Sequence, residues 1–251
     1  FITTPSLGMP GELLDIAVED YVNPIIAKVK SIPELMKDIK PLTQMQTICG
    51  IDGLRFVDAM KSDTAIGPPL TGAKSKFMID LDPEDFPEQA CPKALEPRFW
   101  NHFDDICNKY LSGERGYLLF KACLKDEPTP LDKEKVRVFE AACTTLQLIV
   151  RMYFLPIVRL LSIFPLISEC AVGINTVGPE MSEFIEAIRK YGSKRIIAGD
   201  YKKYDLRMPA QLTLAAFKVL IRMAKEFGYS ERALTIMRGV ATDICFPVIM
   251  Y

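Results

Sequence analysis

The sequence is poor in the side chains that build zinc sites. It has one histidine, His102, and its seven cysteines are scattered without a Cys-x-x-Cys pair. Zinc sites made from cysteine and histidine need several such residues at short spacing, so this class of site is excluded. Scattered cysteines of this kind are typical of reduced thiols in a cytosolic protein. We interpret His102 as a structural or exposed residue.

The sequence also lacks an excess of charge of either sign. Its 31 basic and 32 acidic residues leave a net charge of −1. A chain this close to neutral has no global field that attracts nucleic acid, so a nucleic-acid site must rest on local basic clusters. With 251 residues and 49% hydrophobic content, the chain can bury a sizeable core in one large domain or two modest ones.

No signal peptide is evident, because the first residues lack a basic region followed by an apolar one. One long apolar run covers residues 146–167, but Arg151, Arg159, Pro156 and Pro165 interrupt it. An arginine at the centre of a membrane span costs about 2.5 to 3.5 kcal/mol. We therefore predict a buried helix that breaks near Pro156, and no membrane span.

Residues 193–209 combine a short apolar run with two carboxylates. Residues 195–198 predict a short buried strand, Asp200 follows it, and Asp205 precedes a helix that opens at Pro209. Asp200 would then lie where the chain leaves a sheet, a frequent place for chemistry in α/β folds. A carboxylate beside an apolar run needs a cation, a donor or water. The spacing alone leaves open whether these are catalytic groups or ordinary turn residues.

A basic hairpin is predicted upstream. Residues 117–128 and 135–140 resemble two strands joined by a charged loop. Because side chains alternate along a strand, Lys135 and Arg137 share one face. With Lys121 and Lys125 they can form a groove for a polyanion such as a triphosphate. A salt-bridged surface hairpin is the open alternative, because four acidic residues lie close by: Asp126, Glu127, Asp132 and Glu134.

Residues 62–77 form a glycine- and proline-rich turn with hydroxyl groups and the two lysines Lys74 and Lys76. Such a turn can direct backbone N–H groups and ammonium groups towards phosphates. A solvated loop with ordinary lysines is the alternative.

The remaining pattern is mainly helical. Helices are predicted over residues 11–30, with a break at Pro24, and over residues 97–111. Another runs from Pro209 to Phe227 and is closed by Gly228, and Ser230 caps a further helix that ends near Gly239. We predict an exposed acidic loop over residues 80–97 and a strand over residues 243–251.

Three of these segments together resemble the RNA-dependent RNA polymerase of picorna-like viruses (Picornavirales, dicistrovirus and marine type). Their order and spacing match the motifs that this family names G, F and A, and the loop at 173–180 resembles the segment that precedes motif A in dicistrovirus-like and marine relatives. The segments are residues 64–69, residues 125–128 with 133–141, and residues 200–205.

The resemblance implies an α/β (α+β) right-hand polymerase fold. Residues 1–192 would form the fingers region with an N-terminal segment and motifs G and F, and residues 193–251 the beginning of the palm with motif A. The thumb and the remaining palm would be absent. Neither the Gly-Asp-Asp of motif C nor motif B occurs in the sequence. Because the chain starts with Phe1 and not with methionine, and stops at Tyr251 inside an apolar run, we expect a truncated piece of a polyprotein.

The resemblance also assigns catalytic and metal-binding roles. Asp200 resembles the motif A carboxylate that holds two Mg²⁺ (or Mn²⁺) ions, and the Tyr201 carbonyl would lie next to them. Two such ions can activate the primer 3′-hydroxyl and stabilise the leaving pyrophosphate. Asp205 resembles the residue that senses the 2′-hydroxyl of the incoming nucleotide.

Further residues resemble substrate-binding positions. In motif F, cations neutralise the triphosphate, and an acidic residue orients these cations. The matching cations are Arg137, Lys125, Lys135 and Lys133, and the matching acidic residue is Glu140. Thr64, Gly67 and Lys74 fall in or beside the turn that contacts the template. This turn departs from the picornavirus pattern, because residues 65–69 read Ala-Ile-Gly-Pro-Pro where that pattern has Ser-Ala-Gly-Tyr-Pro.

The resemblance therefore implies a fragment of an RNA-directed RNA polymerase of viral genome replication, acting in a replication complex in the host cytoplasm. Its partners would be an RNA template, a primer or product RNA, nucleoside triphosphates and other viral replication proteins. The fragment alone would be inactive, because Asp200 lacks partner carboxylates. Two alternatives remain: a non-catalytic RNA-binding or interaction module derived from a polymerase, and a related reverse transcriptase, against which the acidic Asp205 argues.

Overall fold

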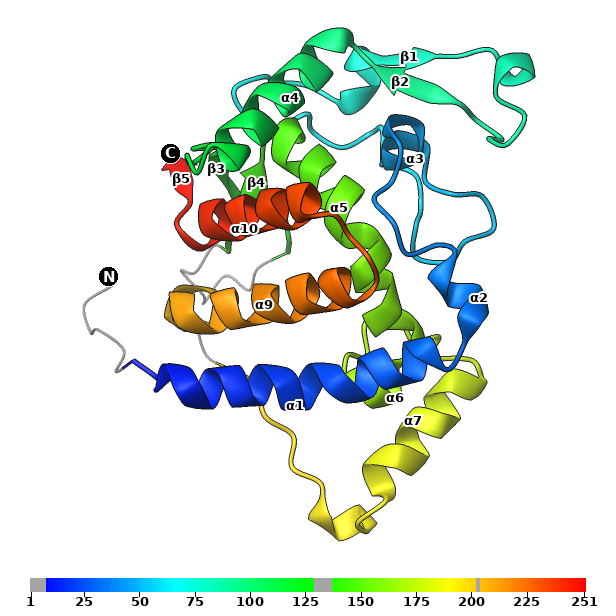
Figure 1. Cartoon of the computed structure of the whole chain (residues 1–251), viewed down its shortest axis with the longest axis vertical. Coiled ribbons are helices and arrows are strands. Elements are labelled where there is room, and N and C mark those ends of the chain that lie inside the picture. Colours follow the sequence, from blue (N-terminus) through cyan, green and yellow to red (C-terminus); the bar gives the residue numbers. More distant parts are fainter. Residues whose placement is uncertain (1–7, 129–136, 202–203) are drawn as a thin grey trace. The chain divides into compact units, whose positions relative to one another are not determined.

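The computed structural model describes residues 8–128, 137–201 and 204–251, with the side chains of residues 205 and 206 also left out (Figure 1). It has mixed helix and sheet content, which confirms the predicted class. The chain divides into two compact units, each made from two separate stretches. Unit 1 comprises Phe1–Ile39 and Ile157–Gly228, and unit 2 comprises Lys40–Pro156 and Tyr229–Tyr251. The predicted subdomain boundary after residue 192 concerns polymerase anatomy and stays a prediction.

Unit 1 is built around the packing of α1 (Gly11–Lys30) along α9 (Ala210–Glu226), which lie side by side (Figure 1). Apolar side chains of both helices are buried, among them Val22, Ile25, Val219 and Met223. The smaller helical elements of this unit are α2 (Pro33–Met36), α6 (Pro165–Ser168), α7 (Pro179–Arg189), the 3-10 turn η3 (Ser193–Arg195) and α8 (Tyr204–Arg207).

Two helices continue through a proline at which we predicted a break. Helix α1 contains Pro24, and α5 (Thr144–Ile163) contains Pro156. A proline removes one backbone hydrogen bond and crowds the preceding turn. In both helices the neighbouring side chains are buried, as Ile25 and Ile157 are, and burial of each such side chain contributes roughly 1.5 to 3 kcal/mol. Packing therefore outweighs the local cost.

Unit 2 contains two small sheets. The strands β1 (Met78–Asp80) and β2 (Lys93–Leu95) pair antiparallel, so β2 lies within the segment 80–97 predicted as an exposed loop, and β1 ends at its first residue. The other sheet has the order β4-β3-β5. In it β3 (Leu119–Leu124) and β4 (Val138–Ala142) form the predicted antiparallel hairpin, and β5 (Val248–Met250) runs parallel to β3.

The helices of unit 2 are α3 (Gln44–Cys49), α4 (Pro97–Leu111), α10 (Glu231–Cys245) and the first part of α5, with 3-10 turns η1 (Lys74–Phe77) and η2 (Pro83–Asp85). Helix α4 has the predicted bounds. Helix α10 continues past Gly239, where we predicted its end, because this glycine lies against α4: a Cβ atom there would be 2.3 Å from the Tyr110 ring. Contact between the helices outweighs the low helix propensity of glycine.

The predicted strand over residues 243–251 is correspondingly shorter. Asp243 lies in the last turn of α10 and is 1% exposed. Its carboxylate accepts hydrogen bonds from the Tyr110 hydroxyl at 2.8 Å and from Arg115 Nε at 3.0 Å. These partners hold a buried carboxylate in the helix, so the strand begins only at Val248.

The predicted buried strand over residues 195–198 is wrong. The 3-10 turn η3 ends at Arg195, and residues 196–200 are irregular and exposed, with Ile197 at 94%. Neither sheet in the described part of the chain includes them. A strand is stabilised by hydrogen bonds to a neighbouring strand, and an apolar run without one does not hold this conformation.

By length and composition, α5 is the one helix in the described residues that could cross a membrane. Half of its apolar window is buried inside the protein. Arg151 donates from Nε to the Thr47 carbonyl at 2.7 Å and from Nη2 to the Asp58 carbonyl. Such contacts are those of a core helix, and they satisfy a cation that would be costly in lipid.

Candidate functional site

Two predicted triphosphate ligands meet just beyond the last paired residues of β3 and β4. Lys125 follows β3, Arg137 precedes β4, and the Lys125 N–H donates to the Arg137 carbonyl at 2.8 Å. The Glu127 carboxylate lies between their side chains, 2.9 Å from Lys125 Nζ and 3.5 Å from Arg137 Nη1. The hydrogen bond from Lys125, followed by the charge of Arg137, lowers the pKa of Glu127. The two cations are thus arranged around one anion.

In this structure Lys125 and Arg137 have the salt-bridged arrangement that we considered as the alternative to an open groove. Lys133 and Lys135 lie outside the described residues. Glu140 is exposed on β4, where it pairs in register with Ala122. The predicted roles of these residues in nucleotide binding stay predictions.

The turn over residues 62–77 is closed by its own hydrogen bonds. The Ile66 N–H donates to the Gly72 carbonyl, and the Lys74 N–H to the Thr64 carbonyl, both at 2.9 Å. Lys74 is only 4% exposed, and its Nζ donates to Thr64 Oγ1 at 2.7 Å and to the Ala65 carbonyl at 2.9 Å. Burial, and after it the charge of Arg151, lowers the pKa of Lys74. Its ammonium group therefore supports the turn from inside.

Gly67 is where this turn meets the hairpin root, by which we mean residues 142–144 at the end of β4 and the start of α5. Its φ of +85° favours glycine, and a Cβ atom would lie 2.4 Å from the Ala142 carbonyl oxygen. One residue before it, the Ile66 carbonyl accepts a hydrogen bond from the Thr144 hydroxyl. Sequence reasoning missed Thr144. No local signal could have found it, because its partner lies 78 residues away.

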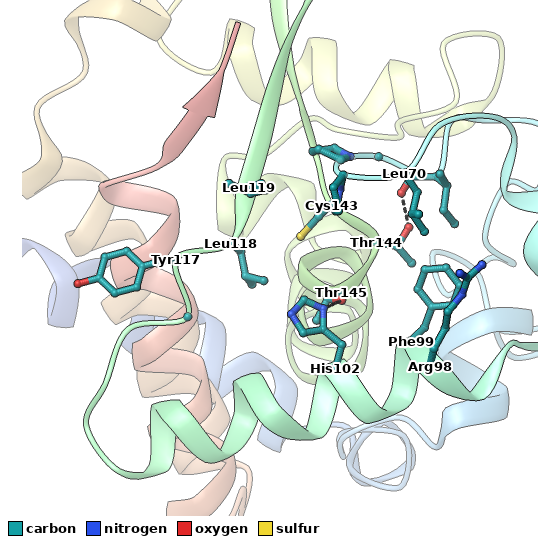
Figure 2. Close-up of a pocket in the computed structure, with 15 residues that line it drawn as sticks. Leu70, Arg98, Phe99, His102, Tyr117, Leu118, Leu119, Cys143, Thr144 and Thr145 are labelled. Atoms are coloured by element: carbon teal, nitrogen blue, oxygen red, sulfur yellow. Dashed lines mark hydrogen bonds between the residues drawn. The ribbon is translucent and has the colours of Figure 1, made fainter.

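A cavity of about 490 Å³ opens beside this contact (Figure 2). Residues 66–70, 116–119 and 143–145 line it together with three side chains of α4. In α4, His102 Nδ1 lies 2.8 Å from Thr145 Oγ1, and the Arg98 guanidinium lies over the rings of Phe77 and Phe99. Burial raises the pKa of the Cys143 thiol, which disfavours its reactive thiolate. His102 is exposed and contacts Thr145, in agreement with the predicted structural or exposed role.

The predicted catalytic aspartates lie just before α8 and within it. Asp200 is irregular and exposed, and Asp205 lies in α8 with its side chain outside the description. Tyr201 is 78% exposed, and its ring centroid lies 5.4 Å from that of Tyr204. These two tyrosines help to line a hollow of about 250 Å³ at the start of α9.

The described residues do not form a complete metal site. No group of three or more histidine, cysteine, aspartate or glutamate side chains in this part of the chain is placed to hold an ion. Asp200 alone does not supply the oxygen ligands that two divalent cations need. The donor set described for this chain therefore does not fit the pair of ions by itself.

The predicted site residues belong to two different units of the chain. The turn with Thr64, Gly67 and Lys74 and the hairpin with Lys125 and Arg137 belong to unit 2, where Thr144 links the turn to the hairpin root. Residues 200–205 belong to unit 1.

Comparisons with known proteins find a viral polymerase family, viral polyproteins and a solved viral polymerase. A family model described as viral RNA-dependent RNA polymerase matches residues 18–251. The genome polyprotein of Deformed wing virus is 22% identical over 249 residues, which cover 93% of this chain and 8% of the polyprotein. The RNA1 polyprotein of Tomato torrado virus is 30% identical over 180 residues, covering 68% of this chain and 8% of the polyprotein.

A solved structure supports the fold. The Sicinivirus 3Dpol RNA-dependent RNA polymerase superposes with a TM-score of 0.63 at 16% identity, covering 94% of this chain and 45% of that chain. The chain thus spans less than half of the solved polymerase and a small part of the polyproteins, and it shares the fold of a partial right-hand polymerase. Because the family match extends over nearly the whole chain, the protein belongs to the viral RNA-dependent RNA polymerase family, with relatives among the picorna-like viruses.

Proposed function

We propose that this chain supplies the fingers and the first part of the palm of an RNA-directed RNA polymerase, which adds nucleoside monophosphates to an RNA 3′ end opposite an RNA template. The observation that carries the proposal is the family match over residues 18–251, which includes the turn, the hairpin and the Asp200 segment in order. We further propose that the complete enzyme acts with other viral replication proteins in a replication complex in the host cytoplasm.

The hairpin is proposed to hold the nucleoside triphosphate. Lys125 and Arg137 already surround one carboxylate, that of Glu127. A triphosphate carries more negative charge than a carboxylate and accepts more hydrogen bonds, so it can displace Glu127 from the two cations. Lys135 and Lys133 would add charge on the same hairpin, and Glu140 would orient the cations.

The Asp200 segment is proposed to contribute to a divalent metal site. Asp200 would supply one carboxylate and Tyr201 a backbone carbonyl to Mg²⁺ or Mn²⁺, which in a two-metal enzyme activates the attacking hydroxyl and stabilises the leaving group. The other ligands would come from outside the described residues. Asp205 would contact the 2′-hydroxyl of the incoming nucleotide, the group by which RNA differs from DNA.

The turn is proposed to contact the template. Lys74 and Thr64 hold its shape through their mutual hydrogen bond, and Gly67 allows it to lie against the hairpin root. Template phosphates would then meet backbone N–H groups and exposed side chains of the turn, while the buried Lys74 acts as its support.

The test is Asp200→Asn in a longer polymerase that contains this chain. We expect RNA synthesis to fall at least about a thousandfold, because a lost metal ligand removes several kcal/mol of transition-state stabilisation. Folding should be unchanged, because Asp200 is exposed. The control is Glu186→Gln, which removes an exposed carboxylate of α7 and should leave synthesis within about twofold. Both are measured by template-dependent nucleotide incorporation.

The same assay distinguishes the proposed function from its alternatives. Retained synthesis in Asp200→Asn would remove Asp200 from the metal site. Synthesis from deoxynucleotides in preference to ribonucleotides would favour a reverse transcriptase, and RNA binding without any synthesis by the longer protein would favour a non-catalytic module.

A further inference from the structure

Thr144 makes a buried connection between two segments that the proposed function uses separately. Its hydroxyl donates to the carbonyl of Ile66, and the two residues are 3% and 0% exposed. Figure 2 marks this bond, which reaches from the start of α5 to the turn. A buried carbonyl that loses its donor is costly, so this bond matters more than an exposed one of the same length.

Hydrogen bonds hold the backbone on both sides of the contact between Thr144 and Ile66. The turn is closed by the backbone bonds of Ile66 and Lys74 and by the Lys74 ammonium. On the other side, the Cys143 N–H donates to the Leu119 carbonyl at 3.1 Å, and Gln147 Nε2 donates to the Ala142 carbonyl at 2.8 Å. Thr144 therefore links a preformed turn to the root of the hairpin.

One side of the turn borders a cavity, although its Ile66 side chain is fully buried. Ile66, Gly67, Pro68, Pro69 and Leu70 all line the cavity of about 490 Å³, so packed side chains are missing there. A void deprives the atoms around it of contacts. On this side the turn contacts residues 142–144, where Gly67 allows the close approach and Thr144 provides a buried hydrogen bond that helps to fix its position.

We infer that Thr144 is a positioning residue for the template: it fixes the turn of residues 64–72 against the hairpin root, so that template RNA meets a turn already in place. The inference rests on the proposed function for the identity of the ligand. It predicts that loss of the hydroxyl weakens template binding and spares the triphosphate, because the triphosphate ligands at the hairpin tip do not depend on this bond.

The first test measures amide hydrogen exchange in the 251-residue chain. Thr144→Val keeps the shape of the side chain and removes the donor. We expect the Ile66 and Lys74 amides, which close the turn, to exchange at least about fivefold faster, the effect of one lost buried hydrogen bond. Thr144→Ser keeps the hydroxyl and should restore slow exchange. The matched control is Thr145→Val, equally buried but bonded to His102, which should leave both amides within about twofold.

A second variant approaches the same contact from the turn. Gly67→Ala would place a methyl group 2.4 Å from the Ala142 carbonyl and should speed exchange of the same two amides. Unchanged exchange in both Thr144→Val and Gly67→Ala would overturn the inference, and so would a uniform increase over the whole of unit 2.

The second test uses a longer polymerase that contains this chain. Thr144→Val should weaken the Kd for template RNA about three- to tenfold and leave the KM for nucleotides within about twofold, whereas a general loss of stability would move both. An unchanged template Kd would overturn the inference. If the wild-type polymerase bound no template RNA, the proposed function would be contradicted, and the exchange experiment would still show whether Thr144 anchors the turn.

Discussion

At the scale of single residues, buried or half-buried polar groups in unit 2 connect segments that are distant in the sequence. Asp243 links α10 to Tyr110 and Arg115, Arg151 links α5 to the Thr47 carbonyl, and Thr144 links α5 to the turn. Each satisfies groups that would be costly to bury alone. These side chains specify how the elements dock, and the apolar core supplies most of the favourable free energy.

Asp243 provides the clearest test of this role. We expect Asp243→Asn to lower the free energy of unfolding of unit 2 by about 1 to 3 kcal/mol, because Arg115 loses its charged partner inside the protein. Urea unfolding can be followed by the fluorescence of Trp100, the only tryptophan of the chain and a residue of unit 2. Asp126→Asn, at an exposed position, should change the value by less than about 0.5 kcal/mol. Equal stability of the two variants would contradict the structural role.

At the scale of elements, the hairpin and the α1–α9 pair both carry clusters of charge. In the hairpin, the Glu127 carboxylate forms ion pairs with two cations, Lys125 and Arg137. Between the helices, Asp15 pairs with Lys218 at 2.6 Å, and Glu19 with Arg222 at 3.2 Å. These pairs are largely exposed, so each contributes little to stability. They give the helix pair a matched pattern of charge.

The ion pairs of Glu127 in the hairpin lead to a prediction about the affinity of the chain for polyanions. In Glu127→Gln, Lys125 and Arg137 lose their shared partner, so we expect the affinity for inorganic tripolyphosphate to rise several-fold. Adding Arg137→Gln should abolish the gain. Asp126→Asn removes the same charge from the same exposed loop and serves as the control for net charge. Calorimetric titration in low salt measures the effect, because screening weakens it. An equal gain in both single variants would show that net charge alone is responsible.

From the ion pairs between α1 and α9 we predict that the thermal stability of the protein depends on pH. Hydrogen bonds from Lys30 and then Arg222 lower the pKa of Glu226 to about 2, from an ordinary value of 4.5. A lowered pKa means that the ionised carboxylate stabilises the fold above the ordinary value, and that this contribution is lost as the pH falls towards 2. Thermal unfolding followed by circular dichroism should therefore separate wild type from Glu226→Gln at pH 6 and no longer do so near pH 2.

The control for this comparison is Glu186→Gln on α7, at an exposed position. It should differ from wild type by a small amount that is the same at both pH values. A constant difference for Glu226→Gln as well would contradict the ion-pair explanation.

At the scale of the whole molecule, the predicted functional residues are distributed over two units. The turn and the hairpin lie in unit 2, and the Asp200 segment lies in unit 1. The chain spans 45% of the solved Sicinivirus polymerase. Among the described residues, Asp200 has no group of further carboxylates with which to hold a metal ion.

We therefore expect the 251-residue chain to show no template-dependent incorporation when supplied with Mg²⁺, primed RNA template and four nucleoside triphosphates. The physical reason is that one carboxylate cannot hold two divalent cations together. A longer polymerase that contains this chain serves as the positive control in the same assay. Incorporation by the purified 251-residue chain above the level of its Asp200→Asn variant would contradict the prediction.

Several elements could be predicted from local pattern. Helix α4 has the predicted bounds, because a proline at its start and a regular apolar stripe are both local signals. The β3–β4 hairpin was likewise predicted from alternation and the charged loop. The wrong predictions concern helix ends that depend on contacts with distant segments. At Pro24 and Pro156 buried neighbouring side chains keep the helix intact. At Gly239 the ring of Tyr110 lies so close that a glycine is required within the helix.

The amino-acid sequence by itself determined the family, because the order and spacing of the turn, the hairpin and the Asp200 segment lie within the chain and need no partner. Only the tertiary structure decided that Lys74 lies inside the turn, that Glu127 holds Lys125 and Arg137, and that Thr144 joins the turn to the hairpin root. It also decided that residues 196–200 form no strand in the described chain. The physical reason is the same throughout: burial and pairing depend on partners that are distant in the sequence, and local propensity contains no information about them.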